Sequence, residues 1–379
     1  MGEPRGTIEP PTSIKAGGRH APPRRRRRRH LAGILVVVGL LVAVFLVVVR
    51  PFGTDGDRRP PPPGASPSTW HDAPLDAHGR PYRPFRDRSW WNTPVPVNAP
   101  QDPEAAQVLN YLSTAPQSGH GCLRFAGAQH SHWGQPAYWA QPGDPEYAVR
   151  GLPSGAPREL RHLRIPAGAR GANNSDGTMT VYDMARGYVA LLTDAHFHAS
   201  SNTWSASGGT VTYLDSNGLI VGTGKSDNPR NTGTHRGNNG ATSYVRFDMV
   251  KAGAVRNVLK IASGPELLDR AVFPMTGSDG DETNPASGAP PEGLRLRIKP
   301  SVDLQHLGLH PQALVIAEAL QKYGMYLGDS GGTTALKLED TRAEGRGQLW
   351  TVTADDLCAL PFTSQYWDVL PEGYDPSAQ

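Results

Sequence analysis

Cysteine is nearly absent from this sequence. The 379 residues include only Cys122 and Cys358. They form no Cys-x-x-Cys pair and no Cys/His spacing that would predict a zinc site. Two cysteines in a compartment outside the cell membrane can form a disulfide, and two free buried thiols are the alternative. We expect this part of the chain to lie outside the cell membrane, which favours a disulfide between Cys122 and Cys358.

Helix-forming runs are also scarce, whereas glycine and proline are abundant, with 43 and 36 residues. Both residue types interrupt helices, so a largely helical fold is disfavoured. We predict an all-β domain of the β-sandwich or jelly-roll type with two or so short helices. The helices are expected over residues 102–112, which open with Asp-Pro-Glu, and over residues 311–323, where apolar residues follow helical spacing up to Gly324.

Strand-like segments in this region are short and are separated by turn residues. The predicted strands cover residues 137–140, 147–151, 179–182, 188–192, 211–214, 258–261, 294–298, 325–327 and 335–338.

Most of the chain carries no excess of positive charge. The formal net charge is +3, and the arginine-rich start of the chain carries it. The remainder is therefore near neutral or slightly acidic. This balance argues against a nucleic-acid partner.

One long apolar run, residues 31–49, contains no charged residue. As a helix it would extend about 28 Å, close to the hydrocarbon thickness of a bilayer. Residues 24–29 before it are all arginine, whereas residues 50–59 after it mix arginine with aspartate. The more basic flank stays in the cytoplasm. We expect a single-pass protein of the bacterial plasma membrane, with the lipid bilayer as partner and the C-terminal domain outside.

Two other interpretations of residues 31–49 fit less well. A cleaved signal peptide has a shorter apolar core and a small-residue cleavage site, which is absent here. An arginine run can bind nucleic acid, but beside a membrane-spanning helix it indicates topology. The predicted organisation is a disordered basic tail (1–30), a transmembrane helix (31–49), a proline-rich stalk (50–69), a β-rich domain (70–374) and a short tail (375–379).

Six short motifs follow one another between about residues 85 and 370. They are WNTPV at 91–95, MTVYD at 179–183, WSASG at 204–208, DSNG at 215–218, RIKPSVD at 297–303 and YGMYLGDSG at 323–331. On these motifs the chain resembles a broad group of bacterial extracytoplasmic proteins of uncharacterised function. The resemblance implies an extracytoplasmic β-sandwich-like domain and no established reaction. Many members look like parts of cell-surface or polysaccharide-handling systems.

Residues 328–332, with the sequence GDSGG, are similar to the nucleophile loop of trypsin-like serine proteases. His196 and Asp248 would complete the triad with Ser330 in the required chain order. However, too many residues of the domain precede His196, a predicted helix leads directly into the loop, and the resembling group has no serine there. We therefore expect a tight glycine turn, with the protease as an unlikely alternative.

Two segments have metal-ligand chemistry. Asp279, Asp281 and Glu282 form an oxygen-rich loop that could bind Ca²⁺, but its spacing is not that of an EF-hand, and a solvated acidic loop is the alternative. His196 and His198 share one strand face without a third ligand nearby, so exposed or sugar-contacting histidines are expected instead. No cofactor is predicted.

Residues 222–243 form a long polar stretch that is typical of either a mobile or a functional loop. We expect ligand binding to centre on residues 230–239, together with Trp204 and His196 or His198, in a saccharide groove. The ligand-binding candidates are Trp204, His196, His198, Arg230 and Asn238. The candidates for hydrolytic carboxylates are Asp176, Asp183, Asp215, Asp279 and Asp329, and a lyase would use His235 and Arg236.

The leading hypothesis from the sequence is a membrane-anchored domain that binds or processes envelope or extracellular polysaccharide. A non-catalytic module for surface display or interaction is the rival. The two differ in whether the candidate side chains converge in one cleft.

Overall fold

The computed structural model describes residues 70–115, 121–264 and 266–378. This part of the chain is mostly β-sheet with three α-helices. Among these residues no helix is both long and apolar enough to cross a bilayer. The predicted tail, transmembrane helix and stalk, residues 1–69, lie outside the described residues.

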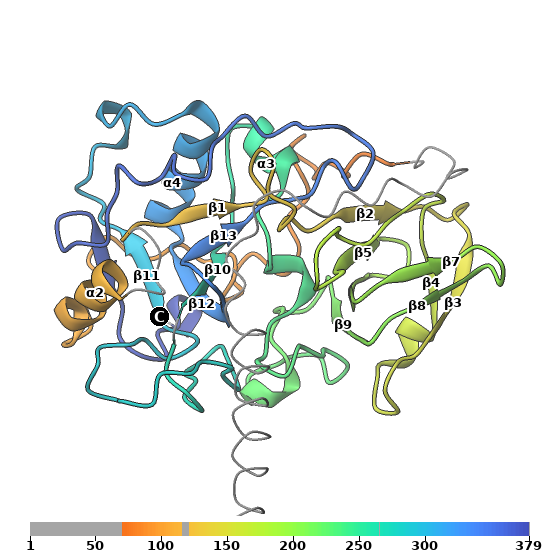
Figure 1. Ribbon diagram of the computed structural model, residues 1–379, viewed down its shortest axis with the longest axis horizontal. Helices are drawn as coiled ribbons and strands as arrows, with labels where there is room; N and C mark the ends of the chain where they lie inside the picture. The colour runs from red at the N-terminus through yellow and green to blue at the C-terminus, as the bar shows by residue number, and fades with distance from the viewer. Residues whose placement is uncertain (1–69, 116–120, 265, 379) are drawn as a thin grey trace, which may run out of the picture. The chain divides into compact units, whose positions relative to one another are not determined.

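The largest sheet has six strands in the order β1-β13-β10-β12-β11-β14 (Figure 1). The central strands β10 and β12 are parallel, as are β1 and β13, and the other neighbouring pairs are antiparallel. The strand bounds are β1 Arg124–Ala126, β10 Leu259–Ser263, β11 Arg295–Ile298, β12 Met325–Ser330, β13 Ala335–Lys337 and β14 Trp367–Val369.

The helices pack with this sheet around one apolar core. Their bounds are α2 Ala105–Thr114, α3 Phe247–Lys251 and α4 Pro311–Lys322. Helix α4 begins with proline at its first turn, and the His310 side chain accepts a hydrogen bond from the Gln312 amide at 3.2 Å. Its buried residues recur at intervals of three and four, which places them on the face toward the sheet: Ala313, Ile316, Ala317, Ala319 and Leu320.

Two smaller sheets of four strands share a second core. Their orders are β2-β5-β6-β9 and β4-β3-β8-β7. The strand bounds are β2 Ala137–Ala140, β3 Glu146–Arg150, β4 His162–Arg164, β5 Met179–Asp183, β6 Tyr188–Thr193, β7 His196–His198, β8 Thr203–Ser205 and β9 Gly208–Tyr213. Strands β5 and β6 form a hairpin whose turn ends at Gly187, where φ is 73° and glycine avoids the strain of a side chain.

A third core, rich in aromatic residues, connects the six-stranded sheet to the β2-β5-β6-β9 sheet. Trp139 of β2 stacks on Tyr182 of β5, with ring centroids 4.1 Å apart. Trp90 packs edge-on against Tyr326 of β12 at 5.3 Å. The buried Arg295 guanidinium lies 4.5 Å above the Trp90 ring. These tryptophans are therefore structural.

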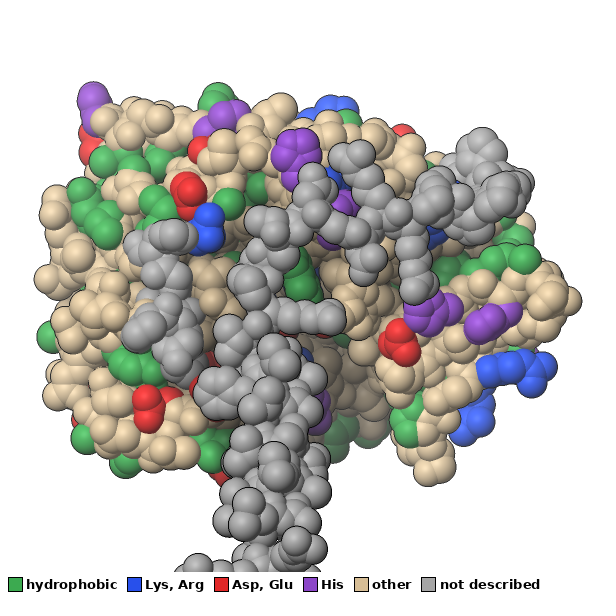
Figure 2. Space-filling view, viewed as in Figure 1, with side chains coloured by type: hydrophobic (Ala, Val, Ile, Leu, Met, Phe, Trp, Pro, Cys, Tyr) green, Lys and Arg blue, Asp and Glu red, His purple; other side chains and the backbone are tan. Residues whose placement is uncertain are grey.

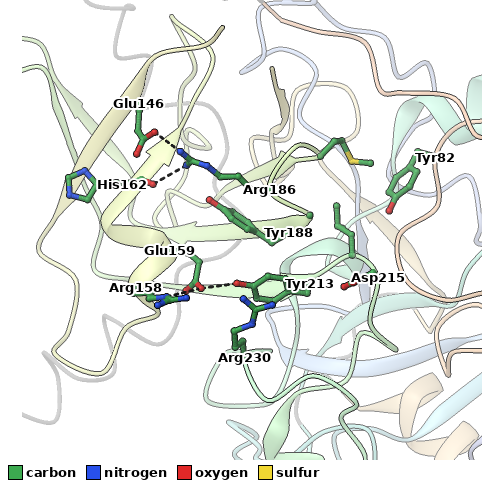
Figure 3. A pocket seen from close by; sticks show the side chains of 13 residues that line it. Tyr82, Glu146, Arg158, Glu159, His162, Arg186, Tyr188, Tyr213, Asp215 and Arg230 are labelled. Atoms are coloured by element: carbon green, nitrogen blue, oxygen red, sulfur yellow. Dashed lines mark hydrogen bonds and ion pairs between the residues drawn. The ribbon is translucent and has the colours of Figure 1, made fainter. Parts of the chain in front are cut away.

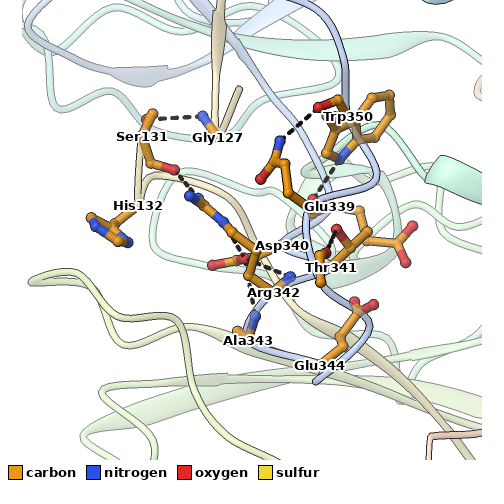
Figure 4. A network of polar contacts seen from close by, with 12 residues as sticks. Gly127, Ser131, His132, Glu339, Asp340, Thr341, Arg342, Ala343, Glu344 and Trp350 are labelled. Carbon is orange, nitrogen blue, oxygen red and sulfur yellow. Dashed lines mark hydrogen bonds and ion pairs between the residues drawn. The ribbon is translucent and has the colours of Figure 1, made fainter. Parts of the chain in front are cut away.

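A polar network between the segment after β13 and the loop before β2 provides a further connection (Figure 4). The Arg342 side chain donates hydrogen bonds to the carbonyl oxygens of Gln129 (2.6 Å) and Ser131. The Trp350 indole donates to the Glu339 carbonyl at 2.7 Å. The Arg342 bonds join segments about two hundred residues apart in sequence and therefore hold these two loops together.

The predicted secondary structure is largely confirmed. Each predicted strand coincides with an observed one to within a few residues, and the two predicted helices correspond to α2 and α4. Helix α3 was not predicted, because five residues do not establish a helical period. The β-rich class with few helices is confirmed. A jelly roll pairs its strands antiparallel, whereas each of the three sheets here contains a parallel pair.

The sulfur atoms of Cys122 and Cys358 form a disulfide. Cys122 immediately precedes the β1 region, and Cys358 lies near the C-terminal end of the domain. The bond therefore closes a covalent loop around most of the domain, with a sequence separation of 236 residues.

Candidate functional site

A groove of about 820 Å³ lies beside the smaller sheets (Figure 3). This volume is in the range of small-molecule sites. The groove is lined mainly by charged and phenolic side chains, with few apolar ones. The lining residues are Tyr82, Glu146, Arg158, Glu159, His162, Met184, Arg186, Gly187, Tyr188, Tyr213, Leu214, Asp215 and Arg230.

Tyr213 organises one wall of the groove. It ends β9 and lies opposite Tyr188 of β6 in the antiparallel register. Its hydroxyl donates to Glu159 Oε1 at 2.8 Å, and the Arg230 guanidinium lies 3.8 Å above its ring (Figure 3). Burial and the Glu159 carboxylate together raise the pKa of Tyr213 to about 12. Tyr213 therefore stays protonated and remains a donor at neutral pH.

Burial alone would raise the pKa of Glu159, but the hydrogen bonds from Tyr213 and Arg158 outweigh it. As a result, the pKa of Glu159 is lower than that of an ordinary glutamate. Glu159 is consequently a carboxylate acceptor at neutral pH. In a hydrolytic reaction it would suit a base or a nucleophile better than an acid.

Arg186 organises the opposite wall. It lies in the β5–β6 hairpin turn and donates to Glu146 Oε2 at 2.5 Å and to the His162 carbonyl at 3.5 Å (Figure 3). The turn itself is held by Asp183, which is buried, accepts from the Arg186 amide at 3.0 Å and pairs with Arg164 at 3.1 Å. The hairpin therefore presents Arg186 to the groove on a rigid support.

A second polar cluster lies at one end of the six-stranded sheet, where the parallel strands β10 and β12 terminate. Arg236 contacts the carboxylates of both Asp279 and Asp329, the latter at 2.6 Å. Lys260, which is buried on β10, pairs with Asp329 at 2.6 Å. Burial raises the pKa of Asp329, but Lys260 and Arg236 outweigh it and hold that pKa below the ordinary value.

The predicted ligand-binding loop, residues 230–239, is divided between these two places. Arg230 lines the groove, whereas Arg236 belongs to the second cluster. Asn238 is buried, donates to the Gly328 carbonyl and accepts from the Tyr326 hydroxyl at 3.1 Å. Asn238 is therefore a structural amide and not a ligand contact. His235 is exposed and lines no part of the groove.

The assignment of Trp204 to a ligand platform was wrong. Its side chain is 2% exposed and belongs to the core between the two smaller sheets. No strand was predicted at β8, so the sequence could not show that its neighbours cover this side chain. His196 and His198 on β7 are exposed and bond to Asp194 (2.8 Å) and Ser205 (2.7 Å). Neither histidine lines the groove.

The protease arrangement is absent from the described residues. The Ser330 amide donates to Asp279 Oδ1 at 3.1 Å, and Ser330 ends β12. His196 lies in a different sheet beside Asp194, and Asp248 pairs with Arg246 on α3. Because each residue has its own partner in a separate element, the three do not form a triad.

The other carboxylate candidates also separate. Asp215 is exposed and lines the groove. Asp176 pairs with Lys337 at 3.4 Å, and Asp183 is the buried support of the hairpin. Within the proposed calcium loop, only Asp279 belongs to a group of converging carboxylates. Glu282 instead accepts from the Asn284 amide at 2.7 Å, and Asp281 is exposed.

Sequence reasoning missed most of the groove. Glu146, Arg158, Glu159, Arg186 and Tyr188 were not candidates, because they come from separate elements and form no motif. The one available signal was the hairpin, since charged side chains in a turn between two buried strands must point to solvent or into a groove. In the second cluster, Lys260 could have been noticed as a charge within an apolar strand.

No family model, no curated protein and no solved structure matches this chain. The resemblance drawn from the motifs therefore stays a prediction, and the functional argument rests on the geometry of the site.

Proposed function

We propose that this protein binds a neutral or weakly acidic saccharide in the groove beside Tyr213. The observation that carries the proposal is the lining: guanidinium donors, carboxylate acceptors and phenolic hydroxyls face a space of about 820 Å³. A polyhydroxylated ligand needs donors and acceptors together, and the strands with the turns and loops between them supply both here.

The charge of the lining supports the ligand class. Three arginines, at positions 158, 186 and 230, are balanced by three carboxylates, at positions 146, 159 and 215. A polyanion such as nucleic acid would require a clear positive excess. On the face in Figure 2, the visible described side chains of Lys, Arg, Asp and Glu are scattered and form no continuous basic patch.

The tyrosine rings contribute little stacking surface. Tyr188 and Tyr213 are 4% and 7% exposed, and Arg230 covers the Tyr213 ring. Recognition in this proposal therefore depends on hydrogen bonds, with fewer ring contacts than a typical sugar platform.

We further propose that the domain acts outside the bacterial plasma membrane and that residues 31–49 anchor it in the bilayer. The two smaller sheets, which share one core, would form a β-sandwich module that carries the groove. Envelope or extracellular polysaccharide is the ligand that such a location offers.

The test is binding of the purified full-length chain, in detergent, to a glycan array and to cell-wall polysaccharide. Arg230→Ala should weaken binding at least about tenfold, because a desolvated charged hydrogen bond contributes about 1.5–3 kcal/mol. Arg270→Ala is the matched control, since Arg270 is an exposed arginine paired with Glu372 at 2.7 Å and does not line the groove.

A parent protein that binds no glycan would contradict the proposal and favour the display module. Equal binding by Arg230→Ala and the parent would show that the glycan binds outside the groove. Any glycan that binds should also be assayed for cleavage with Glu159→Gln, which retains an acceptor for Tyr213. Turnover that this variant loses while binding persists would identify a hydrolase.

A further inference from the structure

We propose that Glu266, Asp279 and Glu292 bind one Ca²⁺ ion at the end of the six-stranded sheet. This site is separate from the groove and does not depend on the function proposed for it. It also differs from the loop ligands expected from the sequence, because Glu266 and Glu292 come from other segments.

The carboxylates of this cluster outnumber its cationic side chains. Four carboxylates converge here, those of Glu266, Asp279, Glu292 and Asp329. They face two cations, Arg236 and Lys260, whose ion pairs involve only Asp279 and Asp329. The nearby Lys337 is balanced by its own pair with Asp176. Among the described residues, two negative charges thus lack a cationic partner, and buried unpaired charge is strongly disfavoured.

Buried carboxylate oxygen atoms of Glu266 and Glu292 also lie in this cluster without hydrogen-bond partners among the described residues. Glu266 and Glu292 are each 0% exposed. In the part of the chain that the structure describes, both Glu266 carboxylate oxygens and Glu292 Oε2 lack any hydrogen-bond partner. Buried polar atoms in folded proteins are nearly always satisfied. A cation would satisfy these oxygens at once.

The distances fit a single ion. One oxygen from each of the three carboxylates lies within 4.8 Å of the others. Ca²⁺ binds oxygen at about 2.3–2.6 Å, so two ligands on opposite sides of an ion are about 5 Å apart. Asp279 is partly exposed, with 30% of its side chain accessible, which gives an ion and its remaining water ligands a route to solvent.

Backbone amides hold two of the three carboxylates, those of Asp279 and Glu292, and leave the Glu266 oxygens unoccupied. The Asp279 amide donates to Glu292 Oε1 at 3.1 Å, and the Ser330 amide donates to Asp279 Oδ1 at 3.1 Å. Gly280 lies directly against the Glu266 backbone, where an added Cβ would come within 2.2 Å of the Glu266 carbonyl oxygen. Glycine is therefore required at position 280 to bring the Asp279 loop onto Glu266.

The competing arrangement is that two of the carboxyls carry protons instead of sharing a cation. Burial next to other carboxylates raises the pKa of Glu292 to about 8 and that of Glu266 well above the ordinary value. Glutamine mimics a protonated glutamate in shape and hydrogen bonding. The two arrangements therefore predict opposite behaviour for the glutamine variants.

The experiment uses the full-length chain in detergent, stripped of metal with a chelator and held at pH 7. Thermal unfolding is followed while CaCl₂ is added up to about 10 mM, which covers the affinities of extracellular calcium sites. The expected result is a saturable rise in the melting temperature of the parent that excess chelator reverses. Glu266→Gln and Glu292→Gln should each abolish the rise.

Glu282→Gln is the matched control, because Glu282 lies in the same acidic loop but outside the three-carboxylate group; it should retain the full rise. If one glutamine variant fails to fold, the other supplies the comparison. A parent without any calcium-dependent rise would overturn the proposal in favour of protonated carboxyls. A rise that persists in both glutamine variants would also overturn it, because the ion would then bind elsewhere.

Discussion

At the scale of single residues, one half-buried guanidinium pairs with two buried carboxylates. Arg346 contacts Glu339 at 2.6 Å and Glu344 at 2.8 Å. The same carboxylates accept from the backbone amides of Phe247 and Ala137 and so join α3 and β2 to this loop. Burial and the neighbouring Glu339 raise the pKa of Glu344 well above its ordinary value of 4.5.

This shift predicts a pH dependence of stability. Glu344 keeps its proton in the folded protein at pH values where the unfolded chain ionises, so stability is full below about pH 4.5 and is lost as the pH rises toward the folded pKa. Glu344→Gln should remove that loss and raise the free energy of unfolding at pH 8 relative to the parent. At pH 4 the two proteins should differ little.

Urea unfolding at pH 4 and pH 8 measures this effect. The exposed Glu318 of α4 provides the control, since Glu318→Gln should change stability little at either pH. A Glu344→Gln variant that is less stable than the parent at pH 8 would show that Glu344 is ionised in the folded protein.

At the scale of elements, the long polar loop after β9 covers the free edge of a sheet. Strand β9 is the last strand of its sheet. Thr232 exchanges hydrogen bonds with Val211, through its amide at 2.8 Å and its hydroxyl at 2.9 Å. Asn231 accepts from the Tyr213 amide at 2.9 Å and donates to the Leu219 carbonyl at 3.0 Å. The loop thus replaces the neighbour that an exposed edge would otherwise recruit.

This edge contact predicts that adjacent residues of the loop have different roles. Asn231 is 1% exposed, so Asn231→Ala leaves buried backbone groups unpaired and should lower the free energy of unfolding by about 2–3 kcal/mol. Arg230→Ala, which removes an exposed cation above an aromatic ring, should cost less than about 1 kcal/mol. Chemical denaturation of both variants provides the measurement. Equal losses in the two would contradict the structural role of Asn231.

At the scale of the whole molecule, the disulfide encloses most of the described domain. A loop with a sequence separation of 236 residues restricts the unfolded chain and is worth about 5 kcal/mol in the chain-entropy model. Changing both cysteines to serine should therefore produce a large loss of stability, measured by unfolding of the full-length chain in detergent.

Thiol labelling supplies the control for this prediction. The denatured but unreduced parent should contain no reactive cysteine, and reduction should expose two. Labelling of both Cys122 and Cys358 without reduction would contradict the bond and remove the reason for the expected loss.

The sequence by itself determined the local structure of this protein. Turn residues and apolar segments located nine of the fourteen described strands, and helical spacing with a proline start and a glycine stop located α4, because these signals act within a few residues. The short strands β1, β4, β7, β8 and β14 were not predicted. The pair of cysteines and the β-rich class also followed from composition. The same local signals made the Gly-Asp-Ser-Gly-Gly segment resemble a catalytic loop or a glycine turn, whereas its first three residues belong to strand β12.

Only the tertiary structure decided which side chains meet. Glu159, Arg186 and Tyr213 line one groove although each comes from a different element, and Glu266, Asp279 and Glu292 converge from three segments without a shared motif. The burial of a side chain could not be predicted from the local sequence either. Trp204 and Asn238 have residue types suited to ligand contact, yet both are buried. Strand pairing brings distant segments together, and no spacing along the chain encodes which face of a strand its neighbours will cover.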